Sequence, residues 1–458
     1  MNWTKKARAL AVLPVAMAFG ACDILTIRDP GRYDDEDLDE ALEAVANSAE
    51  GAVQEWIDWY VIWQSLLSDV YMFTGPHVAY YDTWGLIDEG WIDYGTFPTN
   101  GTNGDMYWTY AYTGNFPDAM AQHKWFAVES WERLVRVKNE EFANSDLMGV
   151  QILLGKALYD MYTALFSCEA VLDEAPSQMY ADEQIYPQVA DTFARVIEVA
   201  LNVDPEVLER SKTEYVNVAR TGRALMLMLS GEYDEAAAEA SAVPDGFTYD
   251  AVKTNVFRDW NKLAYLNGRF NRYAGLMSWL WDRIDIGLNG FIKDERTGVP
   301  DTRMPVSFLN QRGSDSETPY YGQRKYPDFG SPIPMLHSGH ARLIEAEAKV
   351  MQGDYAGATG LLNSLRAGVG LPSVAVPATE DDMIDFLLDE RFAELFLEGH
   401  RAVDLHRFRL TRRVFDDMND VIRPGTGRPS KFPGSSREGQ LNKDVENVKN
   451  VRCSPVGV

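Results

Sequence analysis

Aromatic residues in two irregular stretches are the side chains best suited to binding a ligand. The stretches near residues 75–115 and 268–335 lack helical periodicity and are rich in Gly, Pro, Asn, Asp, Ser or Thr. Loop aromatics suit sugars, whose C–H faces stack on aromatic rings while their hydroxyls take polar partners, and peptides stack on them as well. The residues predicted to bind ligand are Trp84, Trp91, Trp108, Tyr320 and Tyr321, with Tyr94, Tyr107 and Tyr326 nearby.

Patterns that would support catalysis or metal binding are weak. His337 and His340 precede Glu345 and Glu347, but their spacing matches no His-Glu-x-x-His or comparable metal motif. Carboxylate pairs for glycoside hydrolysis cannot be singled out, because 69 Asp and Glu residues make such pairs available anywhere. The sequence has no Gly-x-Ser-x-Gly, no phosphate loop and no Cys/His nucleophile arrangement. We therefore predict no catalytic residues, no metal site and no cofactor.

The N-terminus has the pattern of an export signal. Lys5, Lys6 and Arg8 precede a short apolar run at residues 9–19, which ends in Phe19-Gly-Ala-Cys22. The run is shorter than the roughly 20 residues of a membrane span, and small residues directly before a cysteine are typical of a lipoprotein cleavage site. We predict a signal peptide at residues 1–21, lipidation of Cys22 as the membrane anchor, and a tether at 22–36. The alternative is a plain secretory signal with an incidental cysteine.

Charge and cysteine usage narrow the class of protein further. The chain has 43 Lys and Arg against 69 Asp and Glu, a formal net charge of −26, which argues against nucleic acid as a partner. Cys168 lies in an apolar helical run, where a buried free thiol is the expected state. A bridge to Cys453 is the alternative in an oxidising compartment.

Helical periodicity covers most of residues 37–73, 117–140, 146–172 and 184–202, and a single mainly α domain is predicted over 37–458. Tryptophans at helical spacing are expected in the core: Trp56, Trp59, Trp63, Trp125 and Trp131. An internal repeat relates 219–236 to 341–358. Each copy has an Ala-Arg pair, then Gly231 or Gly353, then Tyr and Ala at matching positions. This predicts two helical hairpins of tetratricopeptide type.

The segment at residues 389–407 carries a dense charge pattern. Glu390, Glu394 and Glu398 recur at i, i+4 and i+8, so they share a helix face and require cations nearby. Arg391, Arg401 and Arg407 are the expected source of those cations.

The pattern Glu-Arg-x-x-Glu-Leu-x-x-Glu-Gly-x-Arg-x-x-Asp-Leu-x-Arg of this segment resembles the C-terminal signature of the SusD-like (RagB/SusD) family. The segments 333–348 and 361–368, and Lys431-Phe-Pro433, are similar to other parts of that family. The resemblance covers the lipidation signal and most of 145–445, but not the aromatic stretch at 75–131.

The resemblance implies a surface-exposed outer-membrane lipoprotein, mainly helical, with tetratricopeptide units. Such a protein captures a glycan or a peptide, acts as a lid on a SusC-like TonB-dependent transporter, and is not an enzyme. In that family the Glu/Arg signature belongs to the scaffold and not to the ligand site. Two other hypotheses stay open from the residues alone: a lipid-anchored glycan-degrading enzyme, and a tetratricopeptide-type assembly scaffold inside the envelope.

Overall fold

The computed structural model describes residues 35–76, 84–89, 120–172, 178–204, 209–256, 259–266, 271–284, 287–418 and 428–432. The chain divides into two compact units, residues 1–45 and 46–458. The described part of the first unit holds α2 (Asp35–Glu40) and the beginning of α3 (Leu42–Leu67), which continues into the second. Among the described residues, no helix combines the length and apolar composition that a membrane span requires.

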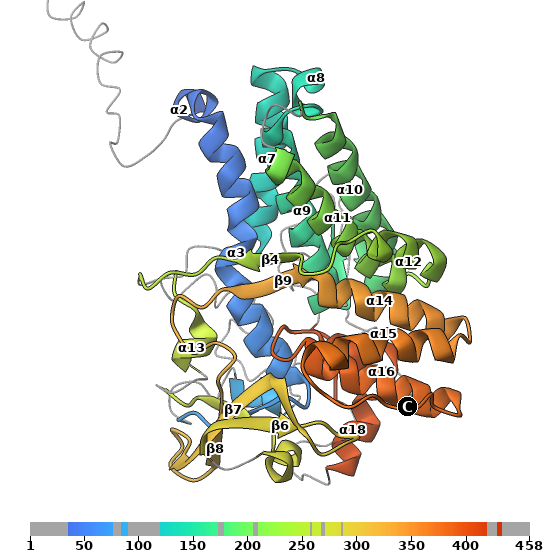
Figure 1. Ribbon diagram of the computed structural model, residues 1–458. Helices are drawn as coiled ribbons and strands as arrows, with labels where there is room; N and C mark the ends of the chain where they lie inside the picture. The colour runs from blue at the N-terminus through green and yellow to red at the C-terminus, as the bar shows by residue number, and fades with distance from the viewer. Residues whose placement is uncertain are drawn as a thin grey trace, which may run out of the picture. The chain divides into compact units, whose positions relative to one another are not determined.

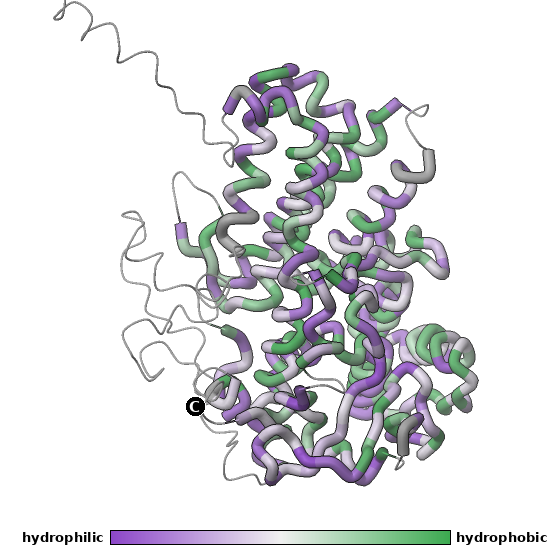
Figure 2. The backbone as a smooth tube through the Cα atoms, turned by 90° about the vertical axis from the view of Figure 1, so that its left-hand side faces the viewer, coloured by the Kyte–Doolittle hydropathy of each residue, from purple (hydrophilic) through white to green (hydrophobic). Residues whose placement is uncertain are grey.

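Helices dominate the second unit, as the periodicity predicts (Figure 1). The first group that follows α3 is α7 (Met120–Val137), α8 (Glu140–Ala143), α9 (Leu147–Phe166), α10 (Asp182–Asn202) and α11 (Glu209–Leu229). Helix α9 is buried along nearly its whole length, as expected of a helix that is apolar on all sides. It begins at Leu147 because the Asp146 side chain accepts a hydrogen bond from the backbone N–H of Met148. Figure 2 shows polar and apolar stretches alternating along the helices.

The internal repeat forms two helical hairpins, which confirms the prediction. The first is α11 with α12 (Tyr233–Ser241), and the second is α14 (Ser338–Met351) with α15 (Tyr355–Gly368). Gly231 and Gly353 end the first helix of each hairpin with φ of +84° and +78°, where a residue without Cβ is favoured. The repeated alanines are fully buried between the helices: Ala224, Ala236, Ala346 and Ala358.

The stretch at 268–335 is more regular than its sequence suggests. Its described residues form the 3-10 helix η2 (Ser278–Arg283) and the strands β5 (Ala274–Leu276), β6 (Gly287–Lys293), β7 (Pro300–Arg312) and β8 (Pro319–Gln323), and β9 (Ile333–His337) begins at its end. Strands β6, β7 and β8 form one antiparallel sheet with several register shifts. Such shifts, with Gly and Pro inside the strands, interrupt the two-residue alternation that would have revealed them in the sequence.

Of the remaining strand pairs in the described residues, two join segments that are far apart in the chain, and the third joins neighbouring segments. Strand β5 pairs antiparallel with β1 (Tyr71–Phe73), β3 (Met179–Ala181) with β2 (Glu169–Val171), and β9 with β4 (Thr248–Ala251). Two short helices follow these strands in the chain: α5 (Leu86–Asp88) after β1, and α13 (Lys262–Leu266) after β4. The stretch predicted as a loop at 75–115 lies mostly outside the described residues.

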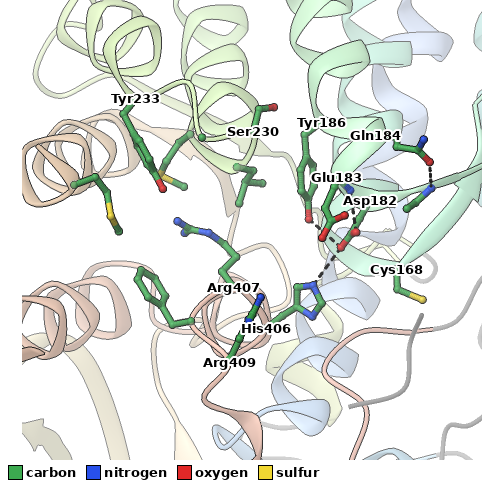
Figure 3. A pocket seen from close by; sticks show the side chains of 16 residues that line it. Cys168, Asp182, Glu183, Gln184, Tyr186, Ser230, Tyr233, His406, Arg407 and Arg409 are labelled. Atoms are coloured by element: carbon green, nitrogen blue, oxygen red, sulfur yellow. Dashed lines mark hydrogen bonds and ion pairs between the residues drawn. The ribbon is translucent and has the colours of Figure 1, made fainter. Parts of the chain in front are cut away.

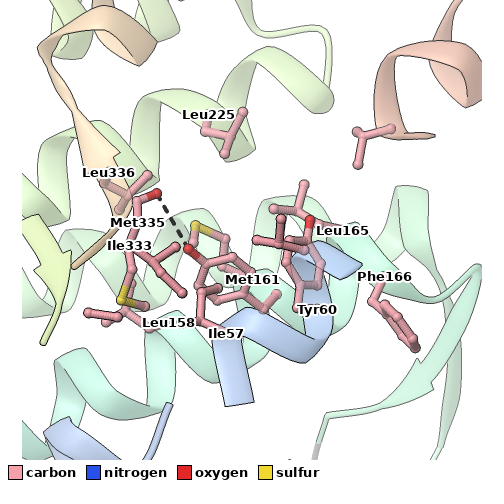
Figure 4. Packing of buried hydrophobic residues seen from close by; sticks show 14 of the residues in the cluster. Ile57, Tyr60, Leu158, Met161, Leu165, Phe166, Leu225, Ile333, Met335 and Leu336 are labelled. Atoms are coloured by element: carbon pink, nitrogen blue, oxygen red, sulfur yellow. Dashed lines mark hydrogen bonds between the residues drawn. The ribbon is translucent and has the colours of Figure 1, made fainter. Parts of the chain in front are cut away.

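One large core joins the first helices to strand β9 (Figure 4). Ile57 of α3, Leu158 of α9, Leu225 of α11 and Met335 of β9 are all buried in it. Helix α9 approaches α3 closely at Gly155, where a Cβ atom would lie 2.2 Å from the backbone oxygen of Ala49. A second cluster lies between the hairpin α14–α15 and α16 (Glu380–Glu394).

The helical tryptophans only partly follow the prediction. Trp56, Trp59 and Trp63 are buried in the core, as expected. Trp125 of α7, however, is 55% exposed, so the prediction that it is a core residue is wrong. Helix α7 is amphipathic, and it buries Ala127 and Leu134.

Candidate functional site

Three aromatic rings stack into a ladder on the β6–β8 sheet. Phe308 of β7 and Tyr321 of β8 are cross-strand partners with ring centroids 4.2 Å apart and planes 13° apart. Trp281 of η2 stacks on Tyr321 at 4.9 Å and 18°. All three side chains are partly exposed. This aromatic ladder (Trp281, Tyr321, Phe308) is an arrangement that fits stacking against sugar rings.

The geometry of the ladder assigns different roles to its rings. Trp281 and Phe308 cover opposite faces of Tyr321, so a sugar ring can stack only on the outer face of Trp281 or of Phe308. The indole N–H of Trp281 donates to the backbone oxygen of Leu276 at 2.9 Å, which fixes the orientation of the ring. Burial, followed by the nearby Asp282 carboxylate, raises the pKa of Tyr321, so its hydroxyl stays protonated and can donate a hydrogen bond.

The other predicted ligand residues lie in different settings. Trp84 is fully buried and packs edge-on against Trp59, and Tyr320 is buried behind the sheet. Neither ring offers a face to a ligand in this conformation. Trp91 and Trp108 lie outside the described residues. Sequence reasoning missed Trp281 and Phe308, although both fall within the stretch at 268–335 where it placed ligand binding.

The signature segment forms a buried ionic scaffold, with α17 (Arg401–Arg407) after α16. Arg366 of α15 pairs with Glu390 and, at 2.8 Å, with Asp294, and all three are buried. Arg303 of β7 pairs with Glu390 at 3.0 Å and with Glu394 at 3.2 Å. These ion pairs therefore connect the β6–β8 sheet to α15 of the second hairpin and to α16.

The cations do not come from the arginines that the sequence suggested. Glu390 and Glu394 take theirs from Arg366 and Arg303, and Glu398 pairs with Lys325 at 2.5 Å. The arginines of the segment bind other acids. Arg391 pairs with Asp404 at 2.9 Å, Arg401 with Asp69 at 2.7 Å, and Arg407 with Glu347. The expectation was wrong because i, i+4 spacing reports neighbours on one helix and not the partners that the fold supplies.

Three histidines cluster beside Glu398. His337 accepts a hydrogen bond from the backbone N–H of Gly339 through Nδ1, so its Nε2 carries the proton and donates to Glu398 at 3.0 Å. His340 and His400 approach each other at 2.9 Å between their Nε2 atoms, and both are buried. Burial lowers the pKa of both, that of His400 to about 4. His337, His340 and Glu398 lie close enough together to hold a metal ion, but an ion at Nε2 of His337 would have to displace the proton that Nε2 donates to Glu398.

Cys168 is disulfide-bonded, so the expectation of a free thiol is wrong. The chain has three cysteines, and the other two, Cys22 and Cys453, lie outside the described residues. A disulfide is consistent with the predicted export signal, because disulfides persist mainly in oxidising compartments.

A separate cavity of about 990 Å³ lies where the two hairpins meet α17 (Figure 3). Residues at the start of α10, in the α11–α12 turn, at the end of α14 and at the end of α17 line it. The aromatic ladder does not contribute to its lining.

Comparisons with known proteins agree with this architecture. The sequence model of the SusD family matches residues 339–450, which contain the signature segment at 389–407. No curated protein matches the sequence.

Several solved structures share the fold. A SusD superfamily protein from Bacteroides vulgatus has a TM-score of 0.64 at 15% identity, over 90% of this chain and 98% of that one. A SusD homolog from Bacteroides thetaiotaomicron has a TM-score of 0.61 at 14% identity, over 90% and 96%. A laminarin binding SusD-like protein has a TM-score of 0.59 at 15% identity, over 92% and 99%.

These features define a mainly α-helical protein with two tetratricopeptide-type hairpins and small antiparallel sheets. The region at residues 339–450 matches the SusD family model, and the fold of the chain is that of SusD-like proteins.

Proposed function

We propose that this chain is a cell-surface lipoprotein that binds a glycan and delivers it to a SusC-like TonB-dependent transporter of the outer membrane, which it covers as a lid. The observation that carries the proposal is the aromatic ladder, exposed on a SusD-like fold. One structure with this fold belongs to a laminarin binding protein, and others are named as carbohydrate or sugar binding.

Within the site, Trp281 is the main stacking residue in this proposal. Its ring is held by one hydrogen bond and supported by Tyr321, so little freedom is lost when a ligand stacks on it. Phe308 offers the second face, and Tyr321 positions both rings. Trp91 and Trp108, which lie outside the described residues, remain candidates for further contacts.

The membrane anchor in this proposal is the lipidated Cys22. No described helix can span a membrane, and acyl chains on a cysteine supply ~0.8 kcal/mol per buried CH₂. Protease treatment of whole cells tests the location. A surface protein is cleaved, whereas an assembly scaffold inside the envelope stays protected, and that result would contradict the proposal.

The binding role is tested with a panel of polysaccharides and their oligosaccharides. The purified protein is titrated calorimetrically with each, and the mixtures are then analysed for new reducing ends. Saturable binding without product formation is expected. Products at catalytic rates would instead favour the glycan-degrading enzyme, the second hypothesis that the residues left open.

A further inference from the structure

The cavity at the junction of the hairpins and α17 is closed beneath by paired charges. Asp182 accepts hydrogen bonds from Lys431 at 2.7 Å and Tyr186 at 3.2 Å, and His406 lies 3.3 Å away. Burial raises the pKa of Asp182, but Lys431 and His406 outweigh it and hold that pKa well below its usual range. Asp182 and Lys431 are therefore paired with each other within the fold, whereas the exposed Glu183 also lines this side of the cavity.

Arg407 also lines the cavity, and its charge is likewise paired within the fold. Its guanidinium pairs with Glu347 and, at 3.4 Å, with Asp404. Figure 3 shows the side chain reaching from the end of α17 toward Tyr233. Arg407 therefore contributes shape and an already neutralised charge to the cavity.

Arg409 at the rim differs from these residues. Its side chain is exposed and lines the cavity, and among the residues that the structure describes no carboxylate lies within ion-pair distance of it. Its backbone has φ of +54° at the end of α17, a position where glycine is favoured because it has no Cβ. Residues held in such a conformation cluster at binding sites, where the side chain is retained despite the strain.

Apolar groups face the cavity beside these charges. Tyr233 of α12 is half-buried, Phe408 follows α17, and Met351 at the end of α14 is 37% exposed. Aromatic and aliphatic walls next to a guanidinium fit a sugar ring that also carries an anionic group, and the volume suits a short oligosaccharide.

We propose that this cavity is a second glycan site, specific for sugars that carry a carboxylate, with Arg409 as the residue that binds the anion. The inference rests on the proposed function, because it assumes that the protein binds glycans. A guanidinium forms two parallel hydrogen bonds with a carboxylate, which selects a uronic acid over its neutral counterpart. The net charge of −26 does not prevent this, because salt screens charges beyond about 8 Å at physiological ionic strength.

The test compares trigalacturonic acid with the neutral galactotriose by calorimetric titration. We expect the wild-type protein to prefer the acid, with an affinity that falls as salt is raised. Arg409→Gly should weaken binding of the acid at least tenfold while raising the melting temperature, because glycine relieves the backbone strain. A higher melting temperature also shows that the variant is folded.

Arg413→Ala is the matched control, because Arg413 is an exposed arginine of the next helix that does not line the cavity. Unchanged affinity for trigalacturonic acid in Arg409→Gly would overturn the inference, and so would the absence of such binding in the wild-type protein. Binding of neutral glycans alone would leave the proposed function intact. If no glycan of either kind binds, both fail.

Discussion

Arg366 donates to Glu390 across 24 residues of sequence, and both side chains are fully buried. The same guanidinium reaches Asp294 and the backbone oxygen of Pro372, so it joins the second hairpin, α16 and the end of β6. This one arginine connects the helical array to the sheet that presents the aromatic ladder.

Removal of Arg366 should therefore destabilise the whole fold. Arg366→Met leaves Asp294 and Glu390 buried without that partner, and we expect a loss of about 3–5 kcal/mol in the free energy of unfolding. Arg412→Met is the control, because Arg412 forms an exposed pair with Asp416 at 3.4 Å, and it should cost at most about 1 kcal/mol. Urea titration measures both free energies of unfolding. Equally small losses for the two variants would show that the buried ion pairs of Arg366 contribute little to stability.

Gly353 and Gly360 provide a matched pair for the second hairpin. Both have open space where a Cβ would lie, but Gly353 has φ of +78° whereas Gly360 lies inside α15. Gly353→Ala should cost about 1 kcal/mol, because alanine disfavours that backbone conformation. Gly360→Ala should instead stabilise the protein by up to about 1 kcal/mol. Thermal unfolding separates the two, and changes of the same sign would contradict this description of the turn.

Sequence reasoning placed these hairpins well, because glycine at a helix end and alanine at a close contact are local requirements. It failed for the partners of Glu390 and Glu394, since Arg303 and Arg366 lie 87 and 24 residues from Glu390. Of the three residues of the aromatic ladder, only Tyr321 was predicted. Tyr321 belongs to a visible aromatic run, whereas Trp281 and Phe308 join it only through sheet pairing and the packing of η2.

The buried histidines predict loss of stability in mild acid. The pKa of His400 falls from an unfolded value near 6.5 to about 4, and that of His340 is also lowered, both chiefly by burial. The unfolded chain therefore takes up protons first, so stability present above pH 6.5 is lost as the pH falls toward 4. His400 alone accounts for up to about 3 kcal/mol of this loss.

His337 has the opposite effect on the pH dependence of stability. Burial alone would lower its pKa, but the Glu398 carboxylate outweighs burial and raises it, so this residue favours the folded state below its raised pKa. His400→Asn should flatten the decline in unfolding free energy between pH 7 and 5, where most carboxylates stay ionised. A decline as steep as in the wild-type protein would exclude His400 as its cause.

The disulfide of Cys168 and the proposed lipid on Cys22 together predict which cysteine is the partner of Cys168. A lipidated Cys22 has no free thiol, so Cys453 is then the only cysteine left to pair with Cys168. Peptide mapping of membrane-extracted protein without reductant should recover a linked pair of peptides containing residues 168 and 453. A free thiol at Cys453 would contradict either the lipidation or the pairing, and the mass of the N-terminal peptide distinguishes the two.

The central claim, that the aromatic ladder binds a glycan, is tested most directly by the affinity of Trp281→Ala for the best ligand of the panel. Loss of one stacking ring should weaken binding about tenfold or more, equivalent to ~1.4 kcal/mol. Trp125→Ala removes an exposed tryptophan on α7, a helix that does not belong to the β6–β8 sheet or to η2, and should leave the affinity unchanged. Equal affinities for the wild-type protein and both variants would show that the ladder does not bind the glycan.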